Sequence, residues 1–296
     1  MSLVINNNLM ALNAARNLSQ SYGNLAVSTR RLSSGLRVGT AADDAAGLAI
    51  RELMRADIAS LHQGVRNAND AISMIQTADG ALQVIDEKLI RMKELAEQAA
   101  TGTYGSAQRL IIDSEYQQMA SEITRIANAT DFNGMYLLNG NLSSLTHDGS
   151  GLNSTGKMKI HFGTGNSSAE DYYYITMGDA RAEALGVGNA NGGTPGHSIS
   201  TQEGAQQALD AINAAIVSKD NIRAHLGAIQ NRLENTITNL SIQAENLQAA
   251  ESRISDVDVA LEMTAFVRNQ ILTQAAVAML AQANQLPQMA MQLMQG

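Results

Sequence analysis

Few residues in this sequence have side chains that could carry out catalysis. There is no cysteine, which excludes a thiol nucleophile, a disulfide framework and a cysteine-based zinc site. The histidines are scattered along the chain without an H-E-x-x-H motif or another zinc-ligand spacing. They are His62, His147, His161, His197 and His225. The sequence therefore predicts no catalytic residue, no metal site and no cofactor.

Two shorter patterns could hold a ligand. Gly163 and Gly165 form a glycine pair, but neither the strand-to-helix context nor the lysine of a phosphate-binding loop accompanies them, so a linker is the better interpretation. Asp43 and Asp44 could bind a metal ion, although an aspartate directly before a helix more often caps its N-terminus. An enzymatic function is not expected.

The composition favours helices that pack closely on one another. Hydrophobic residues make up 45% of the chain but aromatic residues only 3%, and we count 45 alanines among the 296 residues. Alanine favours helices and lets their backbones approach closely. Charged residues make up only 16%, below the ~25% of typical soluble proteins, which suggests that a partner covers part of the surface.

Other functional classes are excluded by charge and hydropathy. A net charge of −8 argues against nucleic-acid binding. No stretch approaches the ~20 apolar residues of a membrane span, so we expect no membrane insertion. The first eight residues lack the basic and apolar regions of a cleaved signal peptide.

A coiled-coil seam is the clearest periodic signal. Eleven steps of three or four residues, 38 in total, lead from Leu61 to Ala99, a mean step near 3.5. Gly64 and Gly80 interrupt this helix, and close contact with another helix is the expected reason. The seam consists of Leu61, Val65, Ala68, Ile72, Ile75, Ala78, Leu82, Ile85, Leu89, Met92, Ala96 and Ala99.

Similar stripes predict four more helices, two of them at the chain ends. One runs from Ile112 to Ile126, and another from Ala205 to Leu247. Because the N-terminal and C-terminal stripes both need a partner, we expect them to pair with each other. The terminal stripes include Ile5, Leu9, Leu12, Leu18, Tyr22, Leu25, Leu32, Val257, Leu261, Leu272, Met279 and Leu286.

A segment of different character separates these helices. Residues 134–196 hold 13 of the 24 glycines. Within it, apolar and polar residues alternate from Lys157 to Phe162, and Tyr172 to Met177 reads as a second strand. The predicted fold class is therefore mainly α, a long helical coiled-coil bundle formed by both chain ends, with a small β-hairpin insertion.

Several motifs resemble the conserved signatures of bacterial flagellins. The resemblance covers roughly residues 1–140 and 200–296, and its motifs occur in the family's order. The N-terminal motifs are Arg31–Arg37, Asp43–Ile50, Asn67–Asp70, Gln76–Leu82 and Asp131–Gly134. The C-terminal motifs are Asn239–Leu240, Ala249–Ile254, Asp256–Asp258 and Gln282–Gln285.

This resemblance implies a domain organisation. Residues 1–42 and 255–296 would form an inner coiled-coil domain. Residues 43–140 and 200–254 would form an outer helical domain, and 141–199 a variable insertion at the filament surface. The terminal stripes named above would then be the polymerisation seam between copies.

The resemblance also implies partners and a location. The chain would polymerise with itself into the flagellar filament used for swimming, outside the cell, after export through the flagellar type III apparatus. An export chaperone would hold the C-terminal helix, and the filament cap and hook–filament junction proteins would be further partners. The helix in question is Val257 to Leu293, with Leu272, Met279, Leu286, Met289 and Met291 as anchors.

Recognition by Toll-like receptor 5 is a further implication. The family residues that serve it match Arg91, Leu95, Glu115, Leu226, Gly227, Ala228, Ile229, Gln230, Asn231 and Arg232. Leu226 and Ile229 also lie on the helical stripe, so packing is an alternative role for both. Two other functions remain open: a hook–filament junction protein of the same superfamily, or a secreted helical adhesin.

Overall fold

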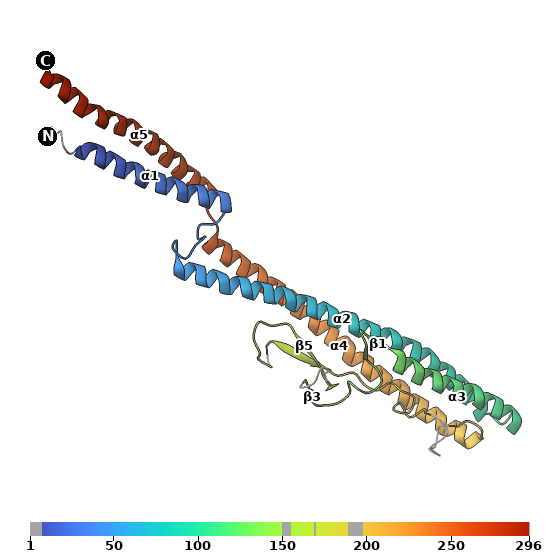
Figure 1. Cartoon of the computed structure of the whole chain (residues 1–296). Helices are drawn as coiled ribbons and strands as arrows, with labels where there is room; N and C mark the ends of the chain where they lie inside the picture. Colours follow the sequence, from blue (N-terminus) through green and yellow to red (C-terminus); the bar gives the residue numbers. More distant parts are fainter. Residues whose placement is uncertain (1–7, 150–154, 169, 189–197, 296) are drawn as a thin grey trace. The chain divides into compact units, whose positions relative to one another are not determined.

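A computed structural model describes residues 8–149, 155–168, 170–188 and 198–295, without the side chains of 155 and 286–295. Its helices are Leu9–Ser34 (α1), Ala45–Ala100 (α2), Ser106–Ala129 (α3), Gln202–Ser255 (α4) and Val259–Gln295 (α5) (Figure 1). Its strands are Asp131–Phe132 (β1), Met135–Tyr136 (β2), His147–Asp148 (β3), Thr155–Gly156 (β4), Met158–His161 (β5) and Tyr172–Ile175 (β6). The mainly α fold with a small β insertion is confirmed.

The chain divides into two units. Unit 1 comprises Met1–Ile58 and Glu245–Gly296, and unit 2 comprises Ala59–Ala244. Both α2 and α4 contribute residues to each unit. Within the described residues, no helix has an 18-residue stretch with the hydropathy of a membrane span.

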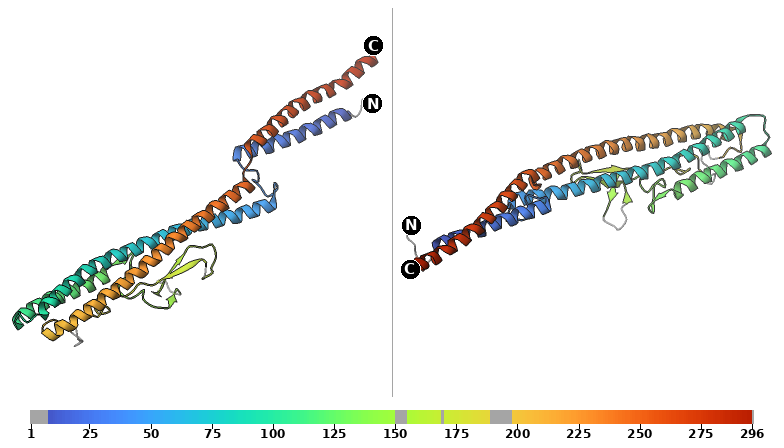
Figure 2. Two further views of the ribbon diagram at one scale, coloured as in Figure 1. Left: turned by 180° about the vertical axis from the view of Figure 1, so that it is seen from behind. Right: turned by 90° about the horizontal axis from the view of Figure 1, so that it is seen from above.

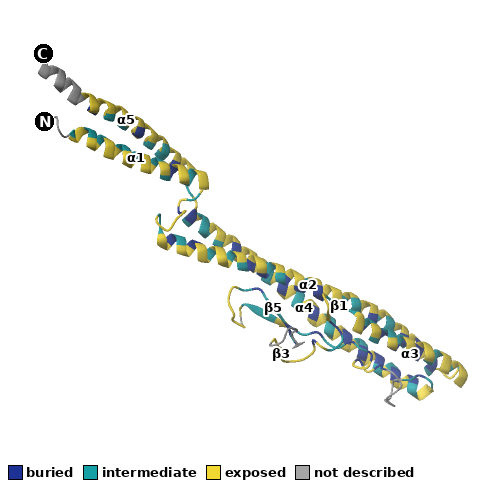
Figure 3. Ribbon diagram, in the orientation of Figure 1, coloured by how far each residue is buried: buried dark blue, intermediate teal, exposed yellow. Residues whose placement is uncertain are grey.

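Unit 2 is built around the predicted coiled-coil seam. Ten of its twelve residues are buried and the other two, Val65 and Ile72, are half-buried. Facing residues of α3 and α4, among them Tyr116, Ile123 and Ile212, complete one apolar core (Figure 3). Burial along α2 therefore follows the spacing of the sequence.

Two ion pairs fix the antiparallel register of α2 and α4. Asp79 Oδ1 lies 2.7 Å from Arg223 Nε, and Asp86 Oδ1 lies 2.5 Å from Lys219 Nζ. The Lys219 side chain is only 2% exposed. Burial alone would lower its pKa, but hydrogen bonds and charge from Asp220 and Asp86 outweigh this and raise the pKa.

The described residues between α3 and α4 form three antiparallel strand pairs: β1–β2 directly after α3, and β3–β4 and β5–β6 in the insertion. In the β5–β6 hairpin, Met158 pairs with Ile175 and His161 with Tyr172. The hairpin packs on α2, where the Asn67 amide donates to the His161 carbonyl at 2.8 Å. It packs on α4 through Arg232, whose guanidinium lies 3.6 Å from the centre of the Tyr173 ring.

From the sequence, Gly64 and Gly80 of α2 were expected to allow close contact with another helix, and this expectation is wrong in both cases. Gly64 meets the backbone of Phe162, at the end of β5, and not another helix. Gly80 is exposed and has no neighbouring atom within 4 Å of the position of a Cβ. Close approach therefore explains only Gly64, and it comes from the insertion.

In unit 1, α1 and α5 lie side by side (Figures 1 and 2). Gly35 ends α1 in the left-handed conformation, with φ 72°. Beyond it, Leu36 bridges to Asp256, and the Arg37 amide donates to the Ser255 carbonyl at 2.7 Å. The two chain ends therefore come together, as predicted.

Candidate functional site

The fully buried residues of α1 and α5 are small or polar. On α1 the described buried residue is Ser28, and on α5 the buried residues are Glu262, Thr273 and Ala283. Each polar residue of α5 has a partner: Glu262 lies 3.7 Å from the Arg31 guanidinium, and the Thr273 hydroxyl donates to the Asn269 carbonyl at 2.8 Å. The larger apolar residues that these helices cover in part, such as Leu18, Leu25 and Phe266, are only half-buried.

Several large apolar side chains of these helices remain exposed to solvent. We define the terminal apolar surface as six seam residues that are about half or more exposed. They are Leu9 (64%), Leu12 (59%), Tyr22 (54%), Leu261 (71%), Leu272 (49%) and Met279 (64%). Figure 3 shows the contrast with unit 2, where the inner faces of the helices are buried. Apolar side chains exposed in such numbers mark an interaction surface.

The other predicted seam residues are less exposed or lie outside the described residues. Four are half-buried: Leu18, Leu25, Leu32 and Val257. Ile5 and the side chain of Leu286 lie outside the described residues, as do the proposed chaperone anchors Met289 and Met291. The described seam therefore separates into an exposed set and a half-buried set.

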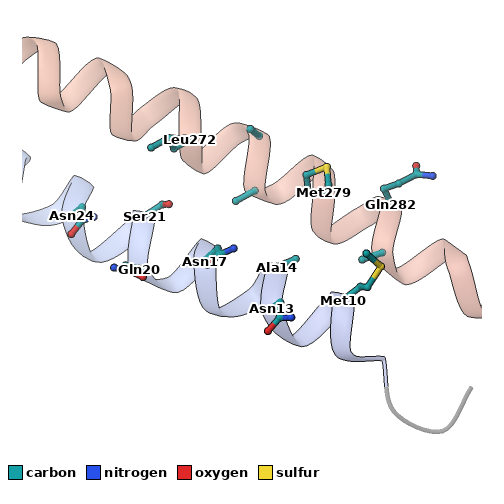
Figure 4. A pocket seen from close by; sticks show the side chains of 13 residues that line it. Met10, Asn13, Ala14, Asn17, Gln20, Ser21, Asn24, Leu272, Met279 and Gln282 are labelled. Carbon is teal, nitrogen blue, oxygen red and sulfur yellow. The ribbon is translucent and has the colours of Figure 1, made fainter. Parts of the chain in front are cut away.

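A cavity of about 770 Å³ lies between α1 and α5 (Figure 4). Its α1 wall is mostly polar, with Asn13, Asn17 and Asn24 among the lining residues. Its α5 wall is apolar, with Leu272 and Met279 beside small alanines. The sequence prediction missed Met10 and the polar residues of the α1 wall, because neither belongs to the apolar stripe of α1.

The connection from α1 to α2 is held by one carboxylate. Asp43 accepts hydrogen bonds from the Thr40 hydroxyl at 2.8 Å and the Thr40 amide at 3.0 Å, and its other oxygen lies 2.8 Å from Arg30. These hydrogen bonds, followed by the charge of Arg30, lower the pKa of Asp43. Asp44 instead caps α2, accepting from the Gly47 amide at 2.9 Å. The two aspartates therefore act as an ion-pair partner and a helix cap.

Two of the histidines considered for ligand chemistry have hydrogen-bond partners in the structure. His147 Nδ1 lies 2.6 Å from the Lys157 carbonyl, and His225 Nε2 lies 3.3 Å from the Thr176 hydroxyl. His197 lies outside the described residues. Across the described chain, no three histidine or acidic side chains converge in a way that could hold a metal ion.

The predicted receptor residues separate into two groups. In the first, Arg91 of α2 lies 2.8 Å from Glu115 of α3 and 2.9 Å from Glu94. The hydrogen bonds that Arg91 donates to Glu115, and then the one to Glu94, raise the Arg91 pKa, so the guanidinium stays charged. Leu95 is only 2% exposed, so it packs in the core and offers no surface contact.

The second group lies on α4. Leu226 is buried and Ile229 is half-buried, whereas Gly227, Asn231 and Arg232 are exposed. Gln230 is half-buried and donates to Glu234 at 3.0 Å, and Ala228 is exposed. Packing is therefore the role of Leu226 in the structure, as the alternative interpretation allowed.

The helix register separates the two groups in space. Arg91 is five residues beyond Asp86, which pairs with Lys219. At a rise of ~1.5 Å per residue, the level of Arg91 on α4 is about 18 Å from Leu226. No small ligand could contact both groups, but a protein surface could.

Comparisons with known proteins match both helical portions of the chain. The model of the bacterial flagellin N-terminal helical region matches residues 5–143, and that of the C-terminal helical region matches residues 209–294. Flagellin of Halalkalibacterium halodurans is 42% identical over 99% of this chain and 100% of its own. Flagellin FlaB2 of Treponema pallidum is 40% identical over the same shares. The crystal structure of Bacillus cereus flagellin is 29% identical, covers 63% of this chain and 94% of its own, and has a TM-score of 0.46.

Proposed function

Because this chain belongs to the bacterial flagellin family, and is accordingly a structural subunit of the flagellar filament and not an enzyme, we propose that the terminal apolar surface is where successive copies polymerise. The observation that carries this proposal is the exposure of six large side chains of α1 and α5, while the fully buried residues of these helices are small or polar. Contacts of this kind, repeated head to tail without closing, build a helical filament.

The energetics require many of these side chains to act together. Association costs about 4–15 kcal/mol in lost freedom of motion. Burying one fully exposed leucine or methionine contributes about 1.5–3 kcal/mol, so the five on this surface, which are 49–71% exposed, would contribute about 5–9 kcal/mol. One contact residue could not offset the cost of association, but the whole set could.

Substitution of Leu261 tests the proposal. Leu261→Glu places a charge where a neighbouring copy would bury an apolar side chain, so we expect no filaments at concentrations where the unmodified chain assembles. Leu145→Glu, at a position that is 82% exposed in the insertion, is the matched control and should assemble normally. Sedimentation and electron microscopy after seeding measure both. Normal assembly of the Leu261 variant, or equal loss in the control, contradicts the proposal.

Truncation provides a coarser test. Removal of residues 1–35 or 260–296 deletes one side of the terminal apolar surface but leaves the described core residues of unit 2 intact. The helical content of unit 2 should therefore persist in circular dichroism while assembly is lost. A truncated chain that still adds to seeds would refute this assignment.

We also propose that the chain has the domain organisation of the flagellin family. Residues 1–42 and 255–296 would form the inner domain, and residues 43–140 and 200–254 the outer domain. Export through the type III apparatus, an extracellular location, and contacts with the cap and junction proteins at the filament ends come with the same proposal. They are supported by membership of the family.

The export chaperone should bind the apolar side chains of α5 before assembly. Leu272 and Met279 are exposed there, and a chaperone that covers them would also prevent premature polymerisation. Replacing both by glutamate should abolish binding of the chaperone in calorimetry, whereas Leu145→Glu should bind normally. Unchanged binding of the double variant would contradict the proposed anchors.

Toll-like receptor 5 recognition is proposed for the exposed residues of the two receptor groups, with Leu95 and Leu226 acting only by packing beneath them. Arg91→Ala should reduce signalling in a receptor reporter assay. Arg125→Ala is the matched control, because Arg125 is also an exposed arginine paired with a glutamate, Glu122, at 2.6 Å. An undiminished signal from the Arg91 variant would remove the receptor proposal without affecting the filament.

A further inference from the structure

Two methionines face the cavity between α1 and α5. Met10 comes from α1 and Met279 from α5, and Figure 4 shows their thioethers near the same end of the cavity. Most other apolar residues that line the cavity are alanines, such as Ala14 and Ala276, so these sulfurs supply much of its apolar bulk. We propose that Met10 and Met279 form an oxidation site, and that their conversion to sulfoxides blocks assembly of the filament. This inference rests on the proposed role of the terminal apolar surface.

Exposure separates these methionines from those of the core. Met10 is 50% and Met279 64% exposed, whereas Met74, Met92 and Met177 are at most 1% exposed. Methionine oxidation follows access to the sulfur. The cavity, at about 770 Å³, admits hydrogen peroxide easily. Peroxide should therefore oxidise the cavity pair well before the core methionines.

The reaction needs only a peroxide as oxidant. A lone pair of the thioether sulfur attacks one peroxide oxygen, the O–O bond breaks and the S–O bond forms. The departing hydroxide takes the remaining proton and leaves as water. Sulfur loses two electrons, which the peroxide gains, and methionine sulfoxide reductases can reverse the change.

The product changes the surface where another copy would bind. A sulfoxide is polar and accepts hydrogen bonds from water, whereas a thioether is a flexible apolar group. A neighbouring copy that covers the cavity would have to strip that water away. Lining amides such as Asn13 and Gln282 offset this cost only where they reach a sulfoxide oxygen. Oxidation of both residues should therefore weaken addition of a copy while unit 2 stays folded.

The test measures the critical concentration of the full-length chain for seeded assembly, before and after hydrogen peroxide. Peptide mapping by mass spectrometry should show sulfoxide first at Met10 and Met279, with Met74 and Met92 oxidised last. We expect the critical concentration of the unsubstituted chain to rise at least tenfold once both sites are oxidised. A rise below twofold, with both sulfoxides present, overturns the inference.

Variants locate the effect, and each is compared with itself before oxidation. In Met10→Leu/Met279→Leu the ratio of critical concentrations should stay within twofold, because leucine keeps the apolar volume and cannot be oxidised. Met263→Leu is the matched control: Met263 is 45% exposed on the same helix but does not line the cavity, so its tenfold ratio should persist. A tenfold ratio in the double variant, or its loss in the control, overturns the assignment.

Two further measurements cover the remaining cases. Treatment of the oxidised chain with both sulfoxide reductases should restore assembly to within twofold, which tests the inference even if the double variant assembles poorly. Leu substitution of Met289, Met291 and Met294 should leave the tenfold ratio unchanged, and protection by these substitutions would move the site to the C-terminus. Failure of the terminal apolar surface proposal can be told apart from failure of this inference. In that case the Leu261→Glu variant assembles normally in the absence of oxidant.

Discussion

Two glycines in α2 should respond in opposite ways to the same substitution. Removing glycine from the interior of a helix in favour of alanine gains about 0.8–1.0 kcal/mol of helix propensity. Gly80 is exposed, with no atom near the position of a Cβ, so Gly80→Ala should stabilise unit 2 by about that amount. Gly64 is buried against the insertion, so the same gain is opposed there by a steric clash.

The size of the clash follows from the distances. A Cβ on Gly64 would lie 2.8 Å from the carbonyl carbon of Phe162 and 2.9 Å from its Cα, and closer still to its oxygen, whereas ordinary contacts begin at 3.4 Å. The hairpin backbone would have to move by more than half an ångström, at a cost of about 1–3 kcal/mol for overpacking. That shift would also strain the hydrogen bond from Asn67 to the His161 carbonyl, which contributes about 1 kcal/mol. After the gain in propensity, Gly64→Ala should be destabilising by about 1–3 kcal/mol.

Thermal unfolding of the unassembled chain, followed by circular dichroism at 222 nm, measures both variants. For a unit of this size, 1 kcal/mol corresponds to about 2–4 °C in Tm. Gly80→Ala should raise Tm by that amount, and Gly64→Ala should lower it. Amide exchange at Phe162 and Gly163, which both donate to the Asp171 carbonyl at 2.9 Å, should accelerate only in the Gly64 variant. A Gly64 variant as stable as the unsubstituted chain would refute the packing of the hairpin on α2.

Two other contacts of unit 2 make testable contributions. Lys219→Met removes a buried ammonium whose partners can regain water, so we expect a loss of about 1–2 kcal/mol in urea unfolding below pH 10. Because the pKa of Lys219 is raised in the folded state, its contribution to the free energy of unfolding is complete below the unfolded pKa of about 10.4 and is lost as pH rises through the folded pKa. The Lys219→Met variant should lack that loss of stability at alkaline pH. Asp113→Ala should cost about 1–3 kcal/mol, because Asp113 accepts from the Ile199 amide at 2.7 Å and the Ser198 hydroxyl at 3.2 Å; Asp113→Asn, which keeps an acceptor, should lose less.

The helices of unit 2 could be predicted from sequence because burial there depends on spacing alone. Residues three and four apart share one face of a helix, and in α2 that face meets the core from Ala68 to Ala99. The pairs β1–β2 and β3–β4 were not predicted, since two-residue strands are too short to show a period. The hairpin β5–β6 was predicted, because four alternating residues on each side are enough.

The contact made by Gly64 could not be predicted in this way. It depends on where a residue almost one hundred positions later returns to α2, and spacing within the helix carries no information about that. The burial of Leu95 has a related cause. Leu95 lies beside the seam on α2. Because α2 meets both α3 and α4 at this level, these two helices cover a stripe of α2 that is wider than the seam.

The terminal helices were predicted as a pair, but not which residues the pair would bury. α5 carries large apolar residues around its circumference, including Met263, Val267 and Ile271, which are exposed as well as the seam residues. One partner helix covers only one side of such a helix. The helical spacing of the apolar residues indicates that the terminal helices need partner helices. It does not say whether those partners come from the same copy of the chain.

The buried polar residues of unit 1 offer a reason for this arrangement. Contacts such as Arg31 with Glu262, and the Asn8 amide with the Ala283 carbonyl at 2.7 Å, set the register of α1 against α5 while burying little apolar area. Partly exposed ion pairs of this kind contribute about 0–1 kcal/mol each, so they specify a geometry without much stabilising it. The apolar residues that would stabilise the pair strongly are left for contacts outside it. If the proposed polymerisation contact is correct, such a subunit would hold its terminal helices in register as a monomer and gain further stability for them when the next copy covers their exposed apolar residues.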